Sequence, residues 1–243
     1  MTASARASGG LKLAPSPCGA LWVRLNDRPA QLRPSGALWL EAERTLICAD
    51  LHLEKGSSYA ARGQLIPPYD TPATLARLEA EVRALSPAQI VLLGDSFHDR
   101  SGSDRMAAGD HARINALAVA CDLIWIVGNH DEEGLDHMPG QRLDDLRIGG
   151  LILRHEPLPG LAEGEVAGHL HPCAKVIATG RGLRRRCFAT DGSRVILPAF
   201  GAYAGGLNLL DPAYAGLFVS PPVACALGRD RVHPLSFSNL RPD

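Results

Sequence analysis

Seven polar side chains in this sequence have the types and the spacing of a metal-binding site. They are two carboxylates, four imidazoles and one amide: Asp50, His52, Asp95, Asn129, His155, His169 and His171. Nitrogen and oxygen donors without a thiolate suit divalent ions such as Mn, Fe, Zn or Ni, and among these we expect Mn. Seven ligands are too many for one tetrahedral ion, so the set predicts two ions that share a bridging carboxylate.

A pair of divalent ions at such a site predicts hydrolysis of a phosphate ester. Two ions roughly 3.5–4 Å apart bind the ester across both metals and lower the pKa of a bridging water, and the resulting hydroxide attacks in line with the leaving oxygen. One motif alone is weak evidence, since an Asp-x-His pair such as Asp50 and His52 is more often an ordinary surface or hydrogen-bonded pair. The five motifs in this order carry the prediction.

Each motif follows an apolar run that is typical of a buried strand. The runs occupy residues 45–49, 90–93, 123–127, 151–154 and 165–167. Because open α/β sheets form their sites at the carboxyl ends of their strands, we expect the motifs to meet at one edge. Residues two apart on an extended segment point to the same side, so Asp50 and His52 are expected to reach one site, as are His169 and His171. Glycines precede three motifs, where the backbone turns sharply or approaches another segment: Gly94, Gly128 and Gly168.

Helices are expected between the strands of the first half of the chain. Thr71 and Pro72 predict a helix start with Thr71 as the N-cap, and an apolar stripe continues to Ser86. A second helix is expected near residues 104–120, so that strands and helices alternate and form a largely parallel sheet. Residues 54–70 form a Pro- and Gly-marked connection directly after a site motif, and we expect it to overhang the site.

The second half lacks helical patterns and is expected to be mostly antiparallel. Its strands are predicted within 143–153, with a turn at Gly149-Gly150, and at 173–178, 183–190 and 194–197. Two short strands at 21–25 and 37–40, separated by a polar segment with Pro29 and Pro34, precede the first motif. The whole pattern predicts an α/β fold in which two mixed sheets pack face to face, flanked by helices. Residues 1–17 are expected to form a flexible tail and residues 18–243 a single domain.

Composition limits the class of protein. The net charge of -1 gives no global attraction to a polyanion, so any nucleic-acid contact has to be local. No apolar run approaches the roughly 18 residues of a membrane helix, and the N-terminal residues lack a signal-like apolar core, so we expect a cytoplasmic protein. Six scattered cysteines without a C-x-x-C pair argue against a zinc ribbon and a disulfide framework.

The motif set resembles that of the calcineurin-like metallophosphoesterases between Asp50 and His171: Asp-x-His, Gly-Asp, Gly-Asn-His-Asp, a lone His and Gly-His-x-His. The resemblance implies a four-layer α-β-β-α sandwich. It also implies a role for each motif residue. One ion would be held by Asp50, His52 and His171, and the other by Asn129, His155 and His169. Asp95 would bridge the two ions, and His130 would be the catalytic residue that stabilises or protonates the transition-state oxygens.

The chain departs from the family pattern after the bridging carboxylate. The second Asp of the pattern is replaced by His98, with Asp99 next, and the usual Arg-Gly is Arg100-Ser101. This difference argues against the Ser/Thr protein phosphatases. His98 either orients Asp95 or touches the substrate, and the sequence leaves both roles open.

A narrower resemblance covers most of the chain. Four segments are similar to the bacterial ligase-associated DNA damage response endonucleases: residues 50–58, 62–70, 94–99 and 197–208. This resemblance implies a DNA phosphodiesterase in a repair setting, acting alongside a DNA ligase and a helicase. The site residues by themselves predict only the hydrolysis of a phosphate ester, not which ester is the substrate. Two alternatives therefore stay open, a phosphatase or diesterase for a small nucleotide or lipid-linked substrate, and a metal-bound scaffold in a repair complex.

Several cations are candidates for contacts with substrate phosphate. Lys55 and Arg62 follow the first motif closely. The densest basic cluster comprises Arg181, Arg184, Arg185 and Arg186. It is either a nucleic-acid contact or a solvated strand edge protected by charge, and we favour the second interpretation.

Overall fold

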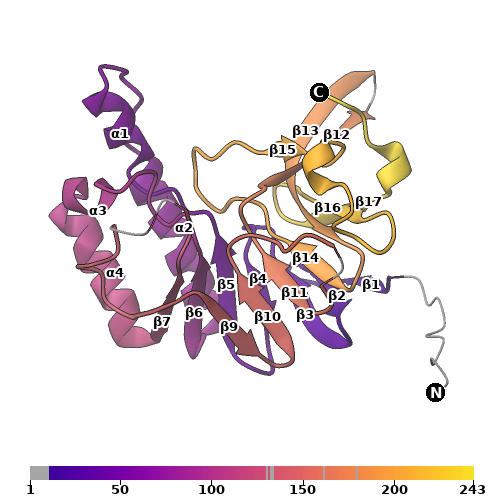
Figure 1. Cartoon of the computed structure of the whole chain (residues 1–243), viewed down its shortest axis with the longest axis horizontal. Helices are drawn as coiled ribbons and strands as arrows, with labels where there is room; N and C mark the ends of the chain where they lie inside the picture. Colours follow the sequence, from indigo (N-terminus) through magenta and orange to yellow (C-terminus); the bar gives the residue numbers. More distant parts are fainter. Residues whose placement is uncertain (1–10, 130, 132–133, 161, 179) are drawn as a thin grey trace.

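Two β-sheets pack face to face in the computed structural model (Figure 1). The structure describes residues 11–129, 131, 134–160, 162–178 and 180–243. A mainly aliphatic core fills the space between the sheets. From both sheets it includes Leu25, Leu32, Ile47, Val91, Leu153, Val166, Phe188 and Val195. The predicted fold class, a mixed two-sheet α/β sandwich, is confirmed.

The first sheet is antiparallel at one side and parallel at the other. In spatial order its strands are β1 (Leu13–Pro15), β2 (Leu21–Leu25), β3 (Arg28–Leu32), β4 (Leu38–Leu40), β5 (Thr45–Ala49), β6 (Gln89–Leu93), β7 (Asp122–Ile126) and β8 (Gln141–Leu143). Strands β5 to β8 are parallel neighbours. The carboxyl ends of β5, β6 and β7 therefore lie at the same edge.

The second sheet is mixed as well. Its main path runs β15 (Leu207–Asn208), β12 (Pro172–Ala178), β13 (Arg181–Thr190), β14 (Arg194–Ile196), β11 (Glu165–Ala167), β10 (Leu151–Arg154) and β9 (Asp145–Ile148), and β13 also pairs with β16 (Val223–Leu227), which pairs with β17 (Val232–Leu235). Most of its pairings are antiparallel, as expected for the second half, but β10, β11 and β14 form a parallel group. This parallel group lets β10 and β11 deliver their site residues to one edge.

Two helices, α2 (Asp70–Leu85) and α4 (Ala108–Ala120), cover the outer face of the first sheet. The shorter helices α1 (Lys55–Ala61) and α3 (Gly102–Arg105) contact each other, and α1 projects beyond the sandwich (Figure 1). Leu75 and Leu78 of α2 pack with Ile114 and Leu117 of α4 over the sheet. The outer face of the second sheet is covered by chain that includes the 3-10 helices η1 (Pro212–Tyr214) and η2 (Phe237–Asn239).

The strand β3 was not predicted, because Pro29 lies in it. Asn26 and Asp27, both with positive φ, form a tight turn that joins β2 to β3. Strand β4 pairs only with Gln31 and Leu32 of β3. The missing N–H of Pro29 therefore leaves no gap in that ladder, since a proline is tolerated where no neighbouring strand needs its donor.

The helical predictions need three corrections. The connection 54–70 contains α1, and α2 begins at Asp70 rather than after Thr71. The Thr71 hydroxyl does not cap the helix but donates to Oε1 of Glu54 at 2.9 Å. The helix predicted near 104–120 is divided into α3 and α4 by an extended residue at Met106.

The N-terminal tail is shorter than expected. Residues 13–15 form β1, which pairs antiparallel with β2, and the tail residues 1–10 lie outside the described part of the chain. In the ranges that the structure describes, none of the helices combines the length and apolar character needed to cross a membrane.

Candidate metal centre

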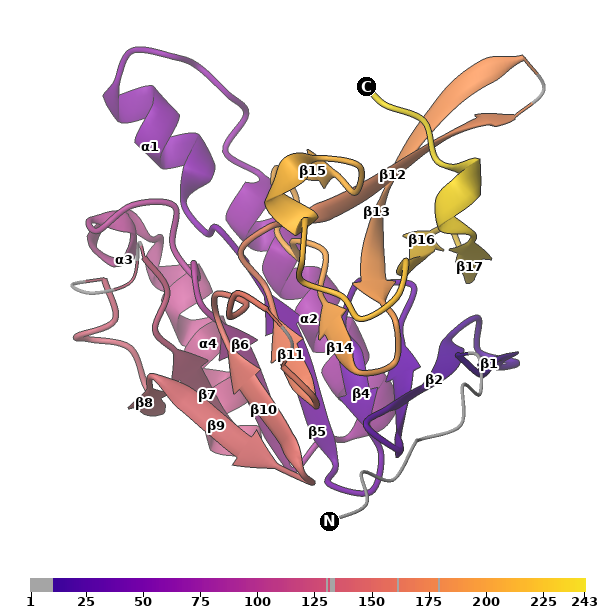
Figure 2. The same ribbon diagram turned by 45° about the vertical axis from the view of Figure 1, so that its right-hand side comes forward.

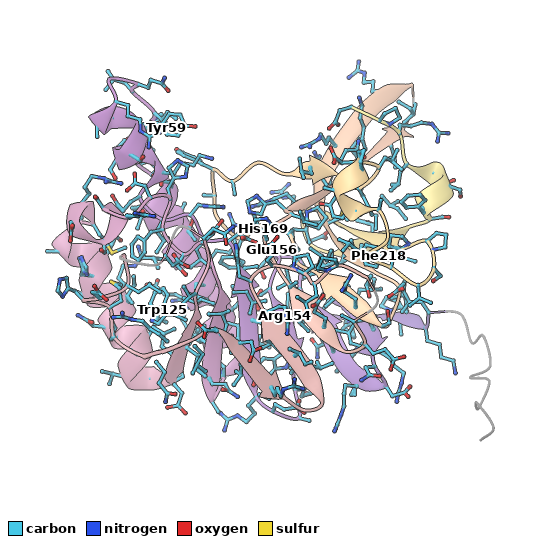
Figure 3. All side chains as sticks on the ribbon, viewed as in Figure 1. Tyr59, Trp125, Arg154, Glu156, His169 and Phe218 are labelled. Atoms are coloured by element: carbon cyan, nitrogen blue, oxygen red, sulfur yellow. The ribbon has the colours of Figure 1, made fainter. Side chains whose placement is uncertain are left out.

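The ends of five strands bring the candidate ligands together between the two sheets. In the first sheet, Asp50 follows β5, Asp95 follows β6 and Asn129 follows β7. In the second sheet, His155 follows β10 and His169 follows β11. Figure 3 shows His169 at the upper edge of the sandwich. It lies between α1, which carries Tyr59, and the hairpin of β12 and β13. Parallel pairing places these ends at one edge of each sheet, and the packing of the sheets brings the two edges together.

Asp50, His52 and His171 form one cluster, in which the ligand atoms lie within 4.8 Å of one another. The Nε2 atoms of His52 and His171 are 3.2 Å apart, and Nε2 of His171 is 3.3 Å from Oδ1 of Asp50. Asp50 is fully buried, and the backbone N–H of His169 donates to its two carboxylate oxygens at 3.1 and 3.0 Å. This contact orients the carboxylate and links the two histidine-bearing segments.

Asp95, His155 and His169 form the second cluster, also within 4.8 Å. Nδ1 of His155 donates to the carbonyl of Leu93 at 3.1 Å, so Nε2 is the acceptor of the neutral ring. That Nε2 lies 3.1 Å from Nδ1 of His169 and 3.4 Å from Oδ1 of Asp95. An acceptor nitrogen that faces a buried carboxylate needs positive charge between them, so a divalent ion fits the cluster.

The two clusters adjoin each other. His155 Nδ1 of the second cluster lies 3.7 Å from Oδ1 of Asp50 in the first. Six of the seven predicted ligands therefore belong to two neighbouring groups, with Asp95 in the group of His155 and His169.

Five of the candidate ligands have left-handed backbone conformations: Asp50 (φ 54°), His52 (φ 43°), Asp95 (φ 45°), His169 (φ 66°) and His171 (φ 46°). Non-glycine residues seldom adopt positive φ, and such residues concentrate at functional sites. The argument from extended segments was therefore wrong. Asp50 and His52 do share a cluster, whereas His169 and His171 belong to different ones.

Glycines before the ligands make room for other ligands. A Cβ on Gly94 would collide with the His155 ring, one on Gly128 with the backbone N of Asp95, and one on Gly168 with Oδ2 of Asp50. The close approach predicted at these glycines is confirmed, and each glycine makes room for a ligand that another strand supplies.

Asn129, the seventh predicted ligand, lies beside the second cluster. It is exposed and lines a pocket of about 220 Å³ together with His155, Glu156, Asp144 and Asp145. The predicted catalytic residue His130 lies outside the described residues.

Asp131, the last residue of the Gly-Asn-His-Asp motif, has a structural role that the sequence did not reveal. Its buried carboxylate accepts backbone hydrogen bonds from Ser96 (2.9 Å), Phe97 (3.3 Å) and Gly128 (3.2 Å). It therefore ties the loop after β6 to the loop after β7. Burial, together with the nearby Asp95, raises the pKa of Asp131 to about 6.

Two of the four predicted substrate contacts line a second pocket, of about 310 Å³, over the first cluster. Lys55 and His98 share this pocket with His52, His171 and residues 204–207. The ring of His98 stacks on Tyr59 with centroids 5.7 Å apart, and its centroid is 6.0 Å from that of His52. His98 therefore lies beside His52 in the pocket over the first cluster.

The other two predicted contacts lie outside that pocket lining. Oδ1 of Asp99 pairs with Arg105 at 2.7 Å and accepts a hydrogen bond from the backbone of Ser101. Arg62 is the exposed C-cap of α1. Asp99 thus helps to hold the loop that carries His98.

Tyr214 supports the second histidine segment and was also missed. Its hydroxyl donates to the carbonyl of Leu170 at 2.9 Å, between His169 and His171. Burial raises the pKa of Tyr214, so the phenol stays protonated and keeps donating. No local sequence pattern links Tyr214 to the site, since 44 residues separate it from Leu170.

The predicted arginine cluster divides into different environments. Arg186 donates to the carbonyls of Ala199 and Gly201, both at 2.8 Å, and is structural. Arg184 donates to the carbonyl of Gly206 at 2.6 Å, while Arg181 and Arg185 are exposed.

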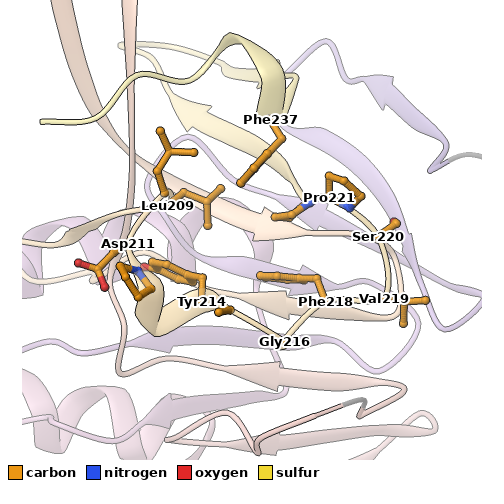
Figure 4. Close-up of a pocket in the computed structure, with 13 residues that line it drawn as sticks. Leu209, Asp211, Tyr214, Gly216, Phe218, Val219, Ser220, Pro221 and Phe237 are labelled. Carbon is orange, nitrogen blue, oxygen red and sulfur yellow. The ribbon is translucent and has the colours of Figure 1, made fainter.

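A separate apolar pocket of about 370 Å³ lies in the C-terminal part of the chain (Figure 4). Tyr214, Phe218, Pro221 and Phe237 line it. Its lining contains no predicted ligand, so the chemistry belongs to the strand-end clusters.

Comparison with known proteins agrees with this site. The calcineurin-like phosphoesterase family model matches residues 43–188. The chain is similar to the solved structure of the nuclease MPE from Pseudomonas putida, with 30% identity and a TM-score of 0.69, over 89% of this chain and 100% of that one. The phosphoesterase Yfce from E. coli is 19% identical with a TM-score of 0.39, over 79% of this chain and 98% of that one. No curated protein matches the sequence.

The family model covers more than half of the chain and includes all seven predicted ligands, from Asp50 to His171. This protein therefore belongs to the calcineurin-like phosphoesterase family and is a metal-dependent phosphoester hydrolase.

Proposed function

We propose that this protein hydrolyses phosphodiester bonds in DNA at a centre of two divalent ions. The observation that carries the proposal is the pair of adjoining clusters, each with nitrogen and oxygen donors within 4.8 Å. A site for a single ion would need only one of the two clusters. The similarity to a nuclease at 30% identity supports a nucleic acid as the substrate, and the segments that resemble DNA damage response endonucleases favour DNA.

The ligand roles follow the two clusters. Asp50, His52 and His171 would hold one ion, and His155 and His169 would hold the other. Asn129 would complete the second set, because it lines a pocket with His155. Asp95 would bridge the ions. Mixed imidazole and carboxylate donors favour Mn, with Fe, Zn or Ni as alternatives.

The residues around the clusters have distinct tasks. When bound, the two ions supply a water of lowered pKa and neutralise charge on the phosphate oxygens. Lys55 brings a positive charge to the pocket over the first cluster, where it would bind a phosphate oxygen. His98, held by Tyr59, would contact the substrate in the same pocket. We assign to His130 the stabilisation or protonation of the transition-state oxygens.

The biological setting is part of the proposal. The segments similar to ligase-associated DNA damage response endonucleases favour a role in DNA repair, with a DNA ligase and a helicase as partners. We also propose a cytoplasmic location. The chemistry of the site does not depend on this setting.

The test compares bis-p-nitrophenyl phosphate, p-nitrophenyl phosphate and single-stranded DNA as substrates, with added Mn or with a chelator. Asp95→Asn and His130→Ala are expected to lower diester turnover about 100-fold or more, because each removes a group that acts in the transition state. Asp122→Asn is the matched control, since Asp122 is exposed at the opposite end of β7. It should turn over like the wild type.

The substrates separate the alternatives. Turnover of the monoester alone would replace the proposal with a phosphatase. Diester turnover without DNA cleavage would favour a small substrate. Bound metal without turnover of any of the three would support a scaffold.

A further inference from the structure

The hairpin formed by β12 and β13 extends beyond the sandwich (Figure 2). Residues 181–185 of β13 are exposed, and 187–190 are buried. Only the buried part pairs with β16, from Cys187 to Thr190. The outer part is a two-stranded ribbon, an arrangement that is only marginally stable by itself. The outer part of the hairpin therefore contributes little to the core, and we expect its exposed side chains to have a function at the surface.

The strand register sorts the cations of the hairpin onto two faces. Residues directly opposite each other in an antiparallel pair share a face, and successive residues alternate. Lys175 pairs with Arg184, and Cys173 pairs with Arg186, which defines an inner face that carries Lys175, Arg184 and Arg186. Arg181 and Arg185 lie on the opposite, outer face.

The inner face borders the pocket over the first cluster. Arg186 contacts the carbonyls of Ala199 and Gly201, and Arg184 contacts the carbonyl of Gly206. Gly206 itself lines the pocket with Lys55. A path of positive charge thus leads from the pocket to Arg184.

A carboxylate already lies beside the cation pair formed by Lys175 and Arg184. Lys175 and Arg184 are like charges directly opposite each other, which is unfavourable without a counter-charge. The Asp243 carboxylate supplies it, at 3.0 Å from Nε of Arg184. Both side chains of this ion pair are partly exposed, 39% and 51%, so a phosphate has access to the same position.

The opposite side of the metal centre has the reverse charge. Asp144, Asp145 and Glu156 line the pocket beside the second cluster. Arg154 also lines it, but its guanidinium already pairs with Asp145 and Glu165. A chain of phosphates is repelled on that side and attracted on the hairpin side.

We propose that the inner face of the β12–β13 hairpin, through Lys175 and Arg184, binds the phosphates of the nucleic-acid strand that leads away from the metal centre. The inference rests on the proposed function and adds the direction in which the strand leaves the site. Phosphate displaces Asp243 from Arg184 when the strand binds. Because such contacts release counterions, binding through them depends on salt.

The experiment compares two double variants with equal charge change. Lys175→Gln/Arg184→Gln alters the inner face and Arg181→Gln/Arg185→Gln the outer face. For each, kcat/KM is measured on a single-stranded DNA oligonucleotide at several salt concentrations and on bis-p-nitrophenyl phosphate. Circular dichroism and thermal unfolding check the fold of each variant.

The inner-face variant should lose DNA kcat/KM about tenfold more than it loses kcat/KM on the small diester. Its slope of log(kcat/KM) against log[salt] should be shallower by about 1.4, or about 0.7 for each lost phosphate contact. The outer-face variant should stay within about twofold of the wild type on both substrates. Asp243→Asn should lower the KM for DNA, because it removes the competing carboxylate.

Three results would overturn the inference. They are equal losses from both faces, an equal loss on both substrates for the inner face, and DNA cleavage by the inner-face variant at the wild-type rate. In the last case the proposed function would stand. If the wild type cleaved the small diester but no DNA, the DNA substrate itself would be wrong and the inference would fall with it.

Discussion

At the residue scale, the candidate ligands occupy backbone conformations that their residue types disfavour. Positive φ at a non-glycine residue costs on the order of 1–3 kcal/mol and persists only where the surrounding contacts impose it. At Asp50 and His169 those contacts include the hydrogen bonds between the His169 N–H and the Asp50 carboxylate. The contacts between motifs therefore hold each motif in its geometry.

Asp131 is a residue whose removal should affect stability directly. In Asp131→Asn, one carboxylate oxygen becomes an NH2 donor that faces the backbone donors of Ser96 or Gly128. We expect a loss of about 1–3 kcal/mol in the free energy of unfolding, the cost of unsatisfied buried donors. Urea denaturation followed by tryptophan fluorescence measures it. Asp122→Asn, at an exposed position, should change stability by less than about 0.5 kcal/mol.

The raised pKa of Asp131 gives this difference a pH dependence in metal-free protein. The folded-state pKa of about 6 exceeds the unfolded value of 3.8, so protonation stabilises the folded state. That contribution is fully present below about pH 4 and is lost as the pH rises through about 6. The stability difference between wild type and Asp131→Asn should therefore grow by about 1–3 kcal/mol between pH 7 and pH 4. A flat difference would show that Asp131 keeps an ordinary pKa.

At the scale of elements, neighbouring elements hold the loops that carry ligands. The loop 168–171 is contacted by Tyr214 of η1 through Leu170, and Gly206, before β15, lies against the carbonyl of His171. The Glu165–Arg194 ion pair, at 2.6 Å between fully buried side chains, joins β11 to β14 below this loop. Elements distant in sequence thus determine where His169 and His171 lie.

Tyr214→Phe tests that support. Loss of the hydroxyl leaves the Leu170 carbonyl without this donor and loosens the loop between two ligands. Because removal of groups that orient ligands typically costs 10–100-fold in metal affinity, we expect about tenfold weaker Mn binding by calorimetric titration. Tyr69→Phe, at an exposed position, should bind Mn like the wild type. Equal Mn affinities in all three proteins would show that the loop 168–171 keeps its conformation without the Tyr214 hydroxyl.

At the scale of the whole molecule, both sheets contribute to one core and to one site. The apolar cluster between them contains residues from Leu21 to Val232, and the two ligand clusters draw on both sheets. We therefore propose that residues 18–243 unfold as a single domain, and that metal bound between the sheets stabilises both of them.

Native probes in each sheet allow a test. The tryptophans, Trp22, Trp39 and Trp125, belong to the first sheet, and the buried thiols of Cys173, Cys187 and Cys225 belong to the second. Tryptophan fluorescence and labelling of these three thiols, resolved by peptide mass spectrometry from Cys48 and Cys121 of the first half, should give the same unfolding midpoint. Adding Mn at 100 times its Kd should stabilise the protein by about 2.7 kcal/mol, and a chelator should remove that gain. Separate midpoints for the two probes would show two folding units.

The sequence by itself determined the strand ends, the ligand types and the fold class. Apolar β-branched runs that stop at Asp, His or Asn are local signals, and the family pattern needs no knowledge of distant contacts. The helix stripe through Leu75 and Leu78 and the turn at Gly149-Gly150 were predictable for the same reason, because local periodicity and turn chemistry specify them.

Only the tertiary structure decided the features that depend on long-range contacts. Pro29 is accepted in β3 because β4 pairs elsewhere, and Thr71 bonds to Glu54 instead of capping α2. The left-handed ligand residues are held by hydrogen bonds to segments that follow other strands, such as those from the backbone of His52 to Asp95 and of His169 to Asp50. The faces of the β12–β13 hairpin, on which Arg184 and Arg185 diverge, follow from strand register, and register is set by pairing between strands that no single stretch of sequence contains.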